Sequence, residues 1–429
     1  MLFLYSIAYT LGVVVLLPAF LLQRQKYASG FSERLGSYPE FVQDDRRVIW
    51  LHCVSVGETN AARPLVGELL KQFPSHRLVV STTTRTGQEL AKKIFGDKAD
   101  AVIYFPFDWK FSVRRALETF RPSLILLMET EIWPRFISEA KRAGAKVAIV
   151  NGRLSQKSYG RYSRVRGFVR RVMEQVDLAL MQAQADADRV QSLGLQPARI
   201  RVTGNIKFDI SSNADESVLT EYFCKRFGID GKKLLIVAAS THEPEEKWVV
   251  GSLNGLKDRS VRLVVVPRHL ERFEEVALLL ADSGRSFVRR SEPETDKDRK
   301  ADIILLDSIG ELRAIYPLAD IVFVGGSLVP HGGQSILEPA AVGKAIVTGY
   351  FTHNFADTIE TFLKNDALIQ LPQLSVGEVT NTFHSVLLGL LSNPARRQEL
   401  GKNASAVMEA NRGVTARTIE FLSEITGNL

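Results

Sequence analysis

The fold is decided by one glycine-rich stretch, Phe323-Val-Gly-Gly-Ser-Leu-Val-Pro-His-Gly-Gly-Gln-Ser-Ile-Leu-Glu-Pro-Ala-Ala341. An apolar run with β-branched residues, Ala319 to Val324, leads into it and predicts a buried parallel strand. Gly325 and Gly326 then allow the backbone to turn sharply and to approach a ligand closely. The stretch therefore predicts a strand, a turn and a helix, as in an α/β sheet.

The second half of this stretch suits an anionic ligand. Gly332 and Gly333 precede a helix predicted to start near Ser335, and free N–H groups at a helix start attract phosphate. Glu338 then lies on the first turn, where its carboxylate can accept hydrogen bonds from ribose hydroxyls. The glycines also fit a purely structural corner. Their spacing differs from G-x-G-x-x-G, so a dinucleotide fold is not indicated.

Outward from this stretch, short apolar runs alternate with amphipathic segments, which predicts parallel sheets covered by helices. A polar, irregular segment over residues 205–230 reads as the connection between two α/β domains. The predicted organisation is a membrane anchor over 1–23, one domain over 24–210 and a second over 211–429 that ends in a helix. The predicted strands are Val48–His52, Leu78–Thr82, Val102–Phe105, Leu124–Glu129, Val147–Asn151, Leu178–Gln182, Ile200–Gly204, Leu234–Ala239, Leu263–Pro267, Ile303–Asp307, Ile321–Gly325 and Ala345–Gly349.

The N-terminus carries an apolar segment from Leu2 to Leu22 without a single charge. As a helix it would span roughly 30 Å, the thickness of a bilayer core. Arg24, Lys26 and Arg34 follow it, and the positive-inside rule then places the rest of the chain on the cytoplasmic side. The alternatives are a half-inserted helix or a buried helix of a soluble protein.

The charge balance favours anionic partners. The net charge is +7, and seven basic residues with no acidic one lie between Arg153 and Val172. A phosphate-rich ligand, an anionic membrane surface or simple solubility would each explain that run. Nucleic acid is not indicated because no nucleic-acid motif is present. The two cysteines fit a reduced compartment.

Polar residues follow several predicted strands, where ligands of open α/β sheets bind. Glu58 opens a helix after the first strand, and either caps that helix or acts as a base. Glu129 and Glu131 together exceed what one helix cap requires. Lys207 ends the first domain, and Arg268 can bind a phosphate or a carboxylate through its fork of donors.

Six motifs, in order, resemble the 3-deoxy-D-manno-octulosonic acid (Kdo) transferases from the anchor to the last helix. They are Trp50-Leu-His-Cys-Val-Ser-Val-Gly-Glu58, Glu129-Thr-Glu-Ile-Trp-Pro134, Gly204-Asn-Ile-Lys-Phe-Asp209, Ser240-Thr-His-Glu243, Val266-Pro-Arg-His269, and Gly325-Gly-Ser-Leu-Val-Pro330 with Leu337-Glu-Pro-Ala340.

The resemblance implies a GT-B fold with two Rossmann-like domains and an active site between them. It implies transfer of Kdo from CMP-Kdo to the lipid A precursor (lipid IVA, a tetraacyldisaccharide bisphosphate) with inversion, at the cytoplasmic side of the inner membrane. Glu58 would be the general base, while Glu129 and Lys207 would stabilise the transition state. The residues expected to hold CMP and Kdo are Pro267, Arg268, Ile309, Gly310, Glu311, Gly325, Gly326, Ser327, Ser335, Ile336, Leu337 and Glu338.

No cofactor and no metal are expected, because the leaving group carries one phosphate and no cluster has metal-ligand spacing; His242 lacks a partner histidine at such spacing. One departure is visible: the family tends to have Gly-Gly-His-Asn where this chain has Gly332-Gly-Gln-Ser335. The alternatives are another GT-B transferase that uses a nucleotide sugar on a lipid, and a lipid-binding protein with a decayed site. The number of Kdo units added, the acyl-chain preference and the oligomeric state do not follow from the sequence.

Overall fold

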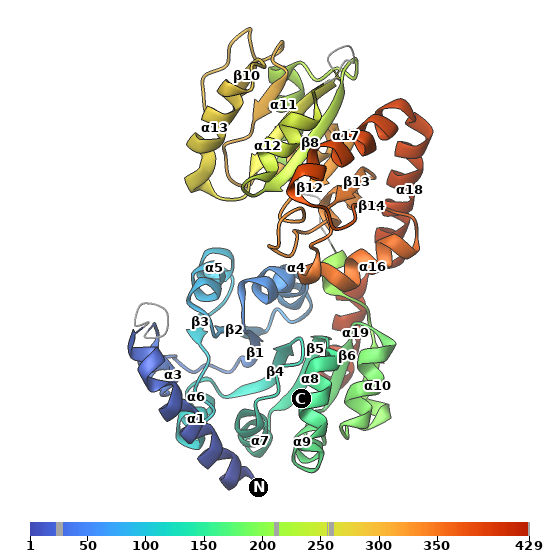
Figure 1. The fold of residues 1–429 in the computed structure, drawn as a ribbon. Coiled ribbons are helices and arrows are strands. Elements are labelled where there is room, and N and C mark those ends of the chain that lie inside the picture. The colour runs from blue at the N-terminus through green and yellow to red at the C-terminus, as the bar shows by residue number, and fades with distance from the viewer. Residues whose placement is uncertain (23–28, 210–213, 255, 257–260, 428–429) are drawn as a thin grey trace. The chain divides into compact units, whose positions relative to one another are not determined.

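The computed structural model describes residues 1–22, 29–209, 214–254, 256 and 261–427 and divides the chain into two compact units (Figure 1). Unit 1 comprises Met1–Asp209 with Asn411–Leu429, and unit 2 comprises Ile210–Ala410. Each unit holds one seven-stranded parallel sheet with helices packed against it. The predicted α/β class, with two parallel sheets, is confirmed.

The sheet of unit 1 has the strand order β3-β2-β1-β4-β5-β6-β7. Its strands are β1 (Arg47–Cys53), β2 (His76–Thr82), β3 (Ala101–Tyr104), β4 (Pro122–Met128), β5 (Lys146–Gly152), β6 (Leu178–Met181) and β7 (Ile200–Val202). Its helices are α1 (Leu2–Leu22), α3 (Phe31–Arg34), α4 (Val56–Gln72), α5 (Arg85–Phe95), α6 (Lys110–Phe120), α7 (Pro134–Arg142), α8 (Gln156–Ser163), α9 (Arg166–Met173), α10 (Gln184–Ser192), α19 (Val414–Thr426) and the 3-10 turns η1 (Pro197–Arg199) and η2 (Ile206–Phe208).

Both faces of this sheet are buried, which explains why its strands are almost continuously apolar. Alternate side chains of β1 separate into two layers. Ile49 and Leu51 pack with α4, α5 and α19, whereas Val48 and Trp50 pack with α6 and α7. Each strand therefore contributes to two cores, and the polar groups of the chain collect at the strand ends.

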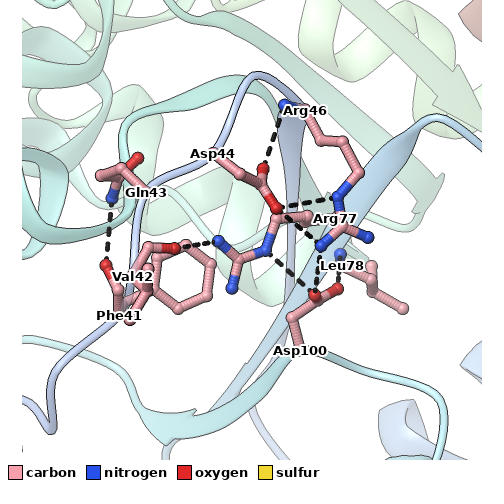
Figure 2. Close-up of polar contacts among 8 residues, drawn as sticks. All are labelled: Phe41, Val42, Gln43, Asp44, Arg46, Arg77, Leu78 and Asp100. Atoms are coloured by element: carbon pink, nitrogen blue, oxygen red, sulfur yellow. Dashed lines mark hydrogen bonds and ion pairs between the residues drawn. The ribbon is translucent and has the colours of Figure 1, made fainter.

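At the amino end of β2, Arg77 contacts the segment that precedes β1 (Figure 2). Its guanidinium lies 3.6 Å from the ring centroid of Phe41 and donates to the carbonyl oxygen of Val42. It also forms a 2.9 Å ion pair with Asp100, whose other oxygen accepts from the N–H of Leu78 at 2.9 Å. Because ligands of parallel sheets bind at the carboxyl ends of strands, this cluster has a structural role.

The sheet of unit 2 has the order β10-β11-β9-β8-β12-β13-β14. Its strands are β8 (Leu234–Thr241), β9 (Val261–Pro267), β10 (Phe287–Arg289), β11 (Ile303–Leu305), β12 (Ile321–Val324), β13 (Ala345–Thr348) and β14 (Ile369–Gln370). Its helices are α11 (Ala214–Phe227), α12 (Glu245–Ser252), α13 (Phe273–Asp282), α14 (Leu312–Ile315), α15 (Leu337–Ala341), α16 (Ala356–Lys364), α17 (Val376–Ser392), α18 (Pro394–Ala410) and the 3-10 turns η3 (Leu270–Arg272), η4 (Tyr316–Leu318) and η5 (His353–Phe355).

Two expectations about chain organisation were wrong. The irregular connection predicted over 205–230 contains helix α11 from Ala214 to Phe227, while residues 210–213 of that connection lie outside the described residues. The C-terminal helix α19 belongs to unit 1 rather than to the second domain. Its residues Val414, Ile419 and Leu422 join the core beneath α4, and the Asp209 carboxylate accepts from the N–H of Gly413 at 2.8 Å.

Helix α1 (dark blue in Figure 1) lies on unit 1 through one polar and aromatic side. The hydroxyl of Tyr5 donates to the buried Asp108 carboxylate at 2.7 Å, and the Tyr5 ring stacks on Phe168 of α9 at 5.6 Å. Arg135 of α7 donates to the hydroxyl of Ser6 at 2.7 Å. In the described part of the chain, no helix is both long and apolar enough to cross a membrane. Residue 23 of the predicted anchor lies outside that part.

The opposite side of α1 is apolar and exposed. Spacings of three and four residues place its side chains on one face of the helix. The exposed residues of this face are Phe3, Leu4, Ile7, Leu11, Val14 and Val15.

Candidate active site

The predicted catalytic residues of unit 1 collect where the strand order reverses. Strands β1 and β4 are neighbours but their connections run to opposite sides of the sheet, and such a switch point is where ligands bind in open α/β sheets. Glu58 follows β1, in the first turn of α4, and Glu129 directly follows β4.

The carboxylate of Glu58 is turned back toward the end of β1 and is only 7% exposed. It accepts from the N–H of Val54 at 2.7 Å and from the hydroxyl of Ser55 at 3.0 Å. Burial raises its pKa to about 7, and the negative charges of Glu129 and Glu131 add to this shift. A carboxyl group with a pKa near 7 is suited to take up a proton at neutral pH.

Glu129 occupies a strained position. Its φ of 54° lies in the left-handed region, which costs a non-glycine residue roughly 1 kcal/mol or more. Its side chain lies 3.8 Å from the Nζ of Lys207, and both groups are about one-third exposed. Burial and Glu129 raise the pKa of the neighbouring Glu131. The structure therefore brings the three predicted catalytic residues into one electrostatically coupled cluster.

Asn151, predicted only as the end of a strand, contacts the turn that carries Lys207. It lies on β5 one residue beyond Val150, which pairs with the last residue of β4, and it also has a left-handed φ, of 53°. Its buried Oδ1 accepts from the N–H of Ile206 at 3.0 Å. This hydrogen bond holds the turn η2, which carries Lys207, over the ends of the central strands. The sequence signal for this role was an asparagine, a residue that tolerates left-handed backbone.

Unit 2 repeats the arrangement at its own switch point, between β8 and β12. Gly325 must lack a side chain, because a Cβ there would lie 2.7 Å from the carbonyl oxygen of Ser240 and 2.8 Å from Glu245. Gly326 has a φ of 65°. The sharp turn after β12 is present, but the neighbour that requires a glycine at position 325 is the protein's own β8 corner, and close approach of this backbone to a ligand stays a prediction.

Glu245 organises this loop and was missed in the sequence. Its fully buried carboxylate accepts from the N–H groups of His242 at 2.9 Å, Gly326 at 2.7 Å, Ser327 at 3.0 Å and Leu328 at 2.9 Å. Burial raises its pKa to about 7, although these four donors favour the charged form. The signal was a carboxylate five residues beyond Ser240, in the first turn of a helix.

Some of the predicted donor-binding residues have buried side chains, and others are accessible. Ser327, Ile336 and Leu337 are buried, and the hydroxyl of Ser327 donates to the carbonyl oxygen of Val324 and accepts from the N–H of Gly349. Those side chains support the loop. Ser335 is half-buried, and its hydroxyl is 3.4 Å from the N–H of Leu337.

Arg268 and Glu338 are the charged members of the donor-binding set at this edge. Arg268 is exposed after Pro267, and its N–H donates to the carbonyl oxygen of Thr241 at 3.0 Å. Glu338 lies in the first turn of α15 as expected. Burial raises its pKa, and the nearby Arg313 and Arg268 oppose that shift.

The loop of Ile309, Gly310 and Glu311 follows β11 and presents one large apolar side chain to solvent. Ile309 is 70% exposed and Gly310 has a φ of 83°. Glu311 is engaged within the protein, because it forms a 2.9 Å ion pair with Arg290 and accepts from the hydroxyl of Ser308. A role in nucleotide binding at this loop stays a prediction.

The chain is similar in sequence to proteins of known activity. Residues 29–210 match the family model described as 3-deoxy-D-manno-octulosonic-acid transferase (kdotransferase). The chain is 33% identical over 399 residues to the 3-deoxy-D-manno-octulosonic acid transferase of Haemophilus influenzae, covering 92% of this chain and 91% of that protein. It is 31% identical to the enzyme of the same name from Chlamydophila psittaci, covering 97% and 95%.

Solved structures agree on the fold. A glycosyltransferase from Rickettsia africae aligns with a TM-score of 0.55 over 90% of this chain and 100% of that chain, at 13% identity. That likeness concerns the fold alone, and it is the GT-B fold predicted from the motifs. Together with the extent of the sequence matches, it shows that the chain is a glycosyltransferase that belongs to the 3-deoxy-D-manno-octulosonic acid (Kdo) transferase family.

Proposed function

We propose that this enzyme transfers Kdo from CMP-Kdo to a phosphorylated lipid A precursor, the tetraacyldisaccharide bisphosphate, with release of CMP and inversion at the anomeric carbon. The observation that carries the proposal is the coupled cluster of Glu58, Glu129 and Lys207 at the switch point of unit 1, in a chain of this family. The presence of Glu58, Glu129, Lys207 and Arg268 together argues against a decayed site.

In this scheme Glu58 takes the proton of the acceptor hydroxyl while the hydroxyl oxygen bonds to the anomeric carbon of Kdo. The bond from that carbon to the phosphate oxygen breaks, and its electron pair leaves with CMP. Lys207, held by Glu129 at 3.8 Å, places a positive charge beside the group that develops negative charge. General base catalysis of this kind contributes roughly 10²- to 10⁴-fold to the rate.

Donor recognition is assigned to unit 2. Arg268 supplies a cation, and Glu338 supplies a carboxylate for the ribose hydroxyls. No metal is needed in this scheme, because N–H groups and cations offset the charge of a single phosphate. Turnover that persists in excess EDTA is the corresponding check.

The lipid acceptor explains the surface of unit 1. Helix α1 contacts α9 through the stack of Tyr5 on Phe168, on the side opposite its apolar face, and α9 begins with the exposed Arg166. Val165, between the exposed Arg164 and Arg166, is itself 53% exposed. An exposed apolar helix face and exposed arginines on the same unit suit the surface of an anionic membrane. We therefore place the enzyme at the cytoplasmic side of the inner membrane, attached through α1.

The test is mass spectrometry of the lipid A precursor after incubation with the purified enzyme and CMP-Kdo. We expect the acceptor mass to increase by one or more Kdo residues, and no product when a UDP-sugar replaces CMP-Kdo. Transfer from the UDP-sugar alone would instead identify another nucleotide-sugar transferase of the same fold.

A further inference from the structure

Three histidines of unit 2 converge at the switch point of its sheet. His242 follows β8, His269 follows β9 and His331 lies in the loop after β12, and these three strands are neighbours in the sheet. The rings of His242 and His331 stack with centroids 4.4 Å apart, and His269 meets His242 edge-on at 5.2 Å. No residue of this trio belongs to the set that the sequence assigned to the donor.

The fold builds this cluster through the glycine-rich loop. The N–H of His242 donates to the same Glu245 carboxylate that gathers the loop after β12. A Cβ on Gly326 would lie 3.2 Å from the His242 ring, so the glycine lets the loop pass close to the imidazole. The side-chain nitrogen of Gln334 lies 3.5 Å from His242 Nε2. The imidazoles are therefore held in place by contacts from two strand corners and the loop.

The surroundings of the cluster favour a negatively charged ligand. His242 is buried, whereas His269, His331 and the preceding Arg268 are exposed. Burial lowers the pKa of His242 to about 4, and His331, His269, Arg268 and Arg272 add to this shift. The carboxylate of Glu245, which accepts from the His242 N–H, is already occupied by four N–H groups. An anion bound here would lie near Arg268 and would accept hydrogen bonds from imidazole N–H groups.

A metal ion fits less well. Among the residues that the structure describes, no group of three or more His, Cys, Asp and Glu side chains has the geometry to hold one. Packing of the core does not explain why two exposed imidazoles lie around a buried one beside an arginine.

We propose that His242, His269 and His331, together with Arg268, form an oxyanion subsite that holds a negatively charged group of the donor. This inference rests on the proposed function, and it adds three histidines to the expected donor-binding set, of which Arg268 is already a member. The shared chemistry is a phosphate or carboxylate oxygen accepting imidazole N–H and guanidinium hydrogen bonds. In the proposed donor, that oxyanion is either the phosphate of CMP or the carboxylate of Kdo.

The experiment compares the full-length wild type with His269→Gln, His331→Gln and the double variant, with His76→Gln in unit 1 as the matched control. His242 is left intact because it is buried in the loop. Calorimetry measures binding of CMP and of cytidine, steady-state kinetics measures KM for CMP-Kdo, and thermal melting confirms folding.

If the subsite holds the phosphate, the double variant binds CMP about tenfold or more weakly than wild type, while its affinity for cytidine is unchanged. If it holds the carboxylate, CMP binding is unchanged and KM for CMP-Kdo rises by a similar factor. Wild-type CMP binding together with wild-type KM in a folded double variant overturns the subsite.

The two proposals fail separately. An enzyme that never turns over CMP-Kdo contradicts the proposed function. The advantage of CMP over cytidine, and its loss in the double variant but not in His76→Gln, would still establish an oxyanion subsite in that case.

Discussion

At the scale of single residues, the buried carboxyl group of Glu58 makes activity depend on pH. Its pKa of about 7 means that it is mostly protonated at pH 6 and mostly ionised at pH 8. Because a general base must be ionised, we expect kcat/KM to rise with pH through about 7 and then to level off. A pH–rate profile measures this. A rise centred below pH 5, the range of an ordinary glutamate, would contradict the assignment.

The same group makes stability depend on pH in the opposite direction. The folded chain binds the Glu58 proton more tightly than the unfolded chain, whose pKa is near 4.5, so ionisation between about 4.5 and about 7 destabilises the fold. The full effect is about 3 kcal/mol. We expect Glu58→Gln to melt at a higher temperature than wild type at pH 8 and at nearly the same temperature at pH 5. A helix-capping role predicts a loss of stability instead.

Asn151 is a positioning residue, because it reaches the cluster only through the N–H of Ile206. Asn151→Gly keeps the left-handed backbone but removes that acceptor, so we expect kcat to fall about tenfold or more with KM for the donor unchanged. Asn151→Asp keeps the acceptor and should restore most of the turnover. It adds a carboxylate beside Glu129, so the pH profile should move upward.

The control for Asn151→Gly is Arg121→Gly. It also introduces a glycine at a residue with left-handed backbone, at the C-terminal end of α6. Equal losses in Asn151→Gly and Asn151→Asp, with an unmoved pH profile, would leave Asn151 a purely structural role.

At the scale of secondary-structure elements, helix α1 has two sides that can be tested separately. Exchanging Leu4, Leu11 and Val15 for serine alters only its exposed apolar face. We expect this variant to remain folded and to sediment far less with vesicles that contain anionic phospholipid. Tyr5→Phe, which removes only the hydroxyl bonded to Asp108, should still sediment. Unchanged sedimentation of the serine variant would show that α1 is not the attachment.

Deleting residues 1–22 tests whether α1 takes part in catalysis. We expect the shortened enzyme to leave the membrane fraction and still to act on detergent-dispersed acceptor. It should melt at a lower temperature, because Asp108 and Arg135 lose their partners on α1. Loss of all turnover in a folded protein at saturating substrate would contradict the view that α1 only attaches the enzyme.

Helices α8 and α9 carry the basic run. Arg164 and Arg166 are exposed, whereas Arg170 already forms an ion pair with Glu174 at 2.9 Å. Each cation near an anionic membrane contributes about 1 kcal/mol. We therefore expect the double reversal Arg164→Glu and Arg166→Glu to weaken vesicle binding at least tenfold at low salt, with a smaller effect at high salt. Lys232→Glu in unit 2 is the control. If the double variant and Lys232→Glu bind the vesicles equally well at low salt, the basic run does not contribute to membrane binding.

At the scale of the whole molecule, apolar runs and strand-to-helix corners predicted both parallel sheets from sequence. The edge strands β10 and β14, of three and two residues, were missed in the sequence. Helix α19 was placed in the wrong unit, because a helical pattern does not reveal which sheet the helix covers. Packing over α4 decides that, and it depends on contacts far apart in the chain.

Some residues of the candidate site could likewise be predicted from the sequence, and others could not. Glu58, Glu129 and Lys207 were predictable because each follows a strand in a recognisable motif. Asn151 and Glu245 were not. Asn151 accepts from the N–H of Ile206, 55 residues away in the chain, and Glu245 accepts from three N–H groups of the loop after β12 that are 81 to 83 residues away. The shift of the Glu58 pKa was also beyond the sequence, since it arises mainly from burial.

The central claim is that the carboxylate cluster of unit 1 deprotonates the acceptor through Glu58. The most direct test is the rate of Kdo transfer from CMP-Kdo to the lipid A precursor by Glu58→Gln, with Glu68→Gln on the exposed part of the same helix as control. We expect Glu58→Gln to fold and to bind CMP normally while the rate falls roughly 10²- to 10⁴-fold, and Glu68→Gln to match wild type. A near-normal rate in folded Glu58→Gln would contradict the account and make Glu129 or Glu131 the next candidate base.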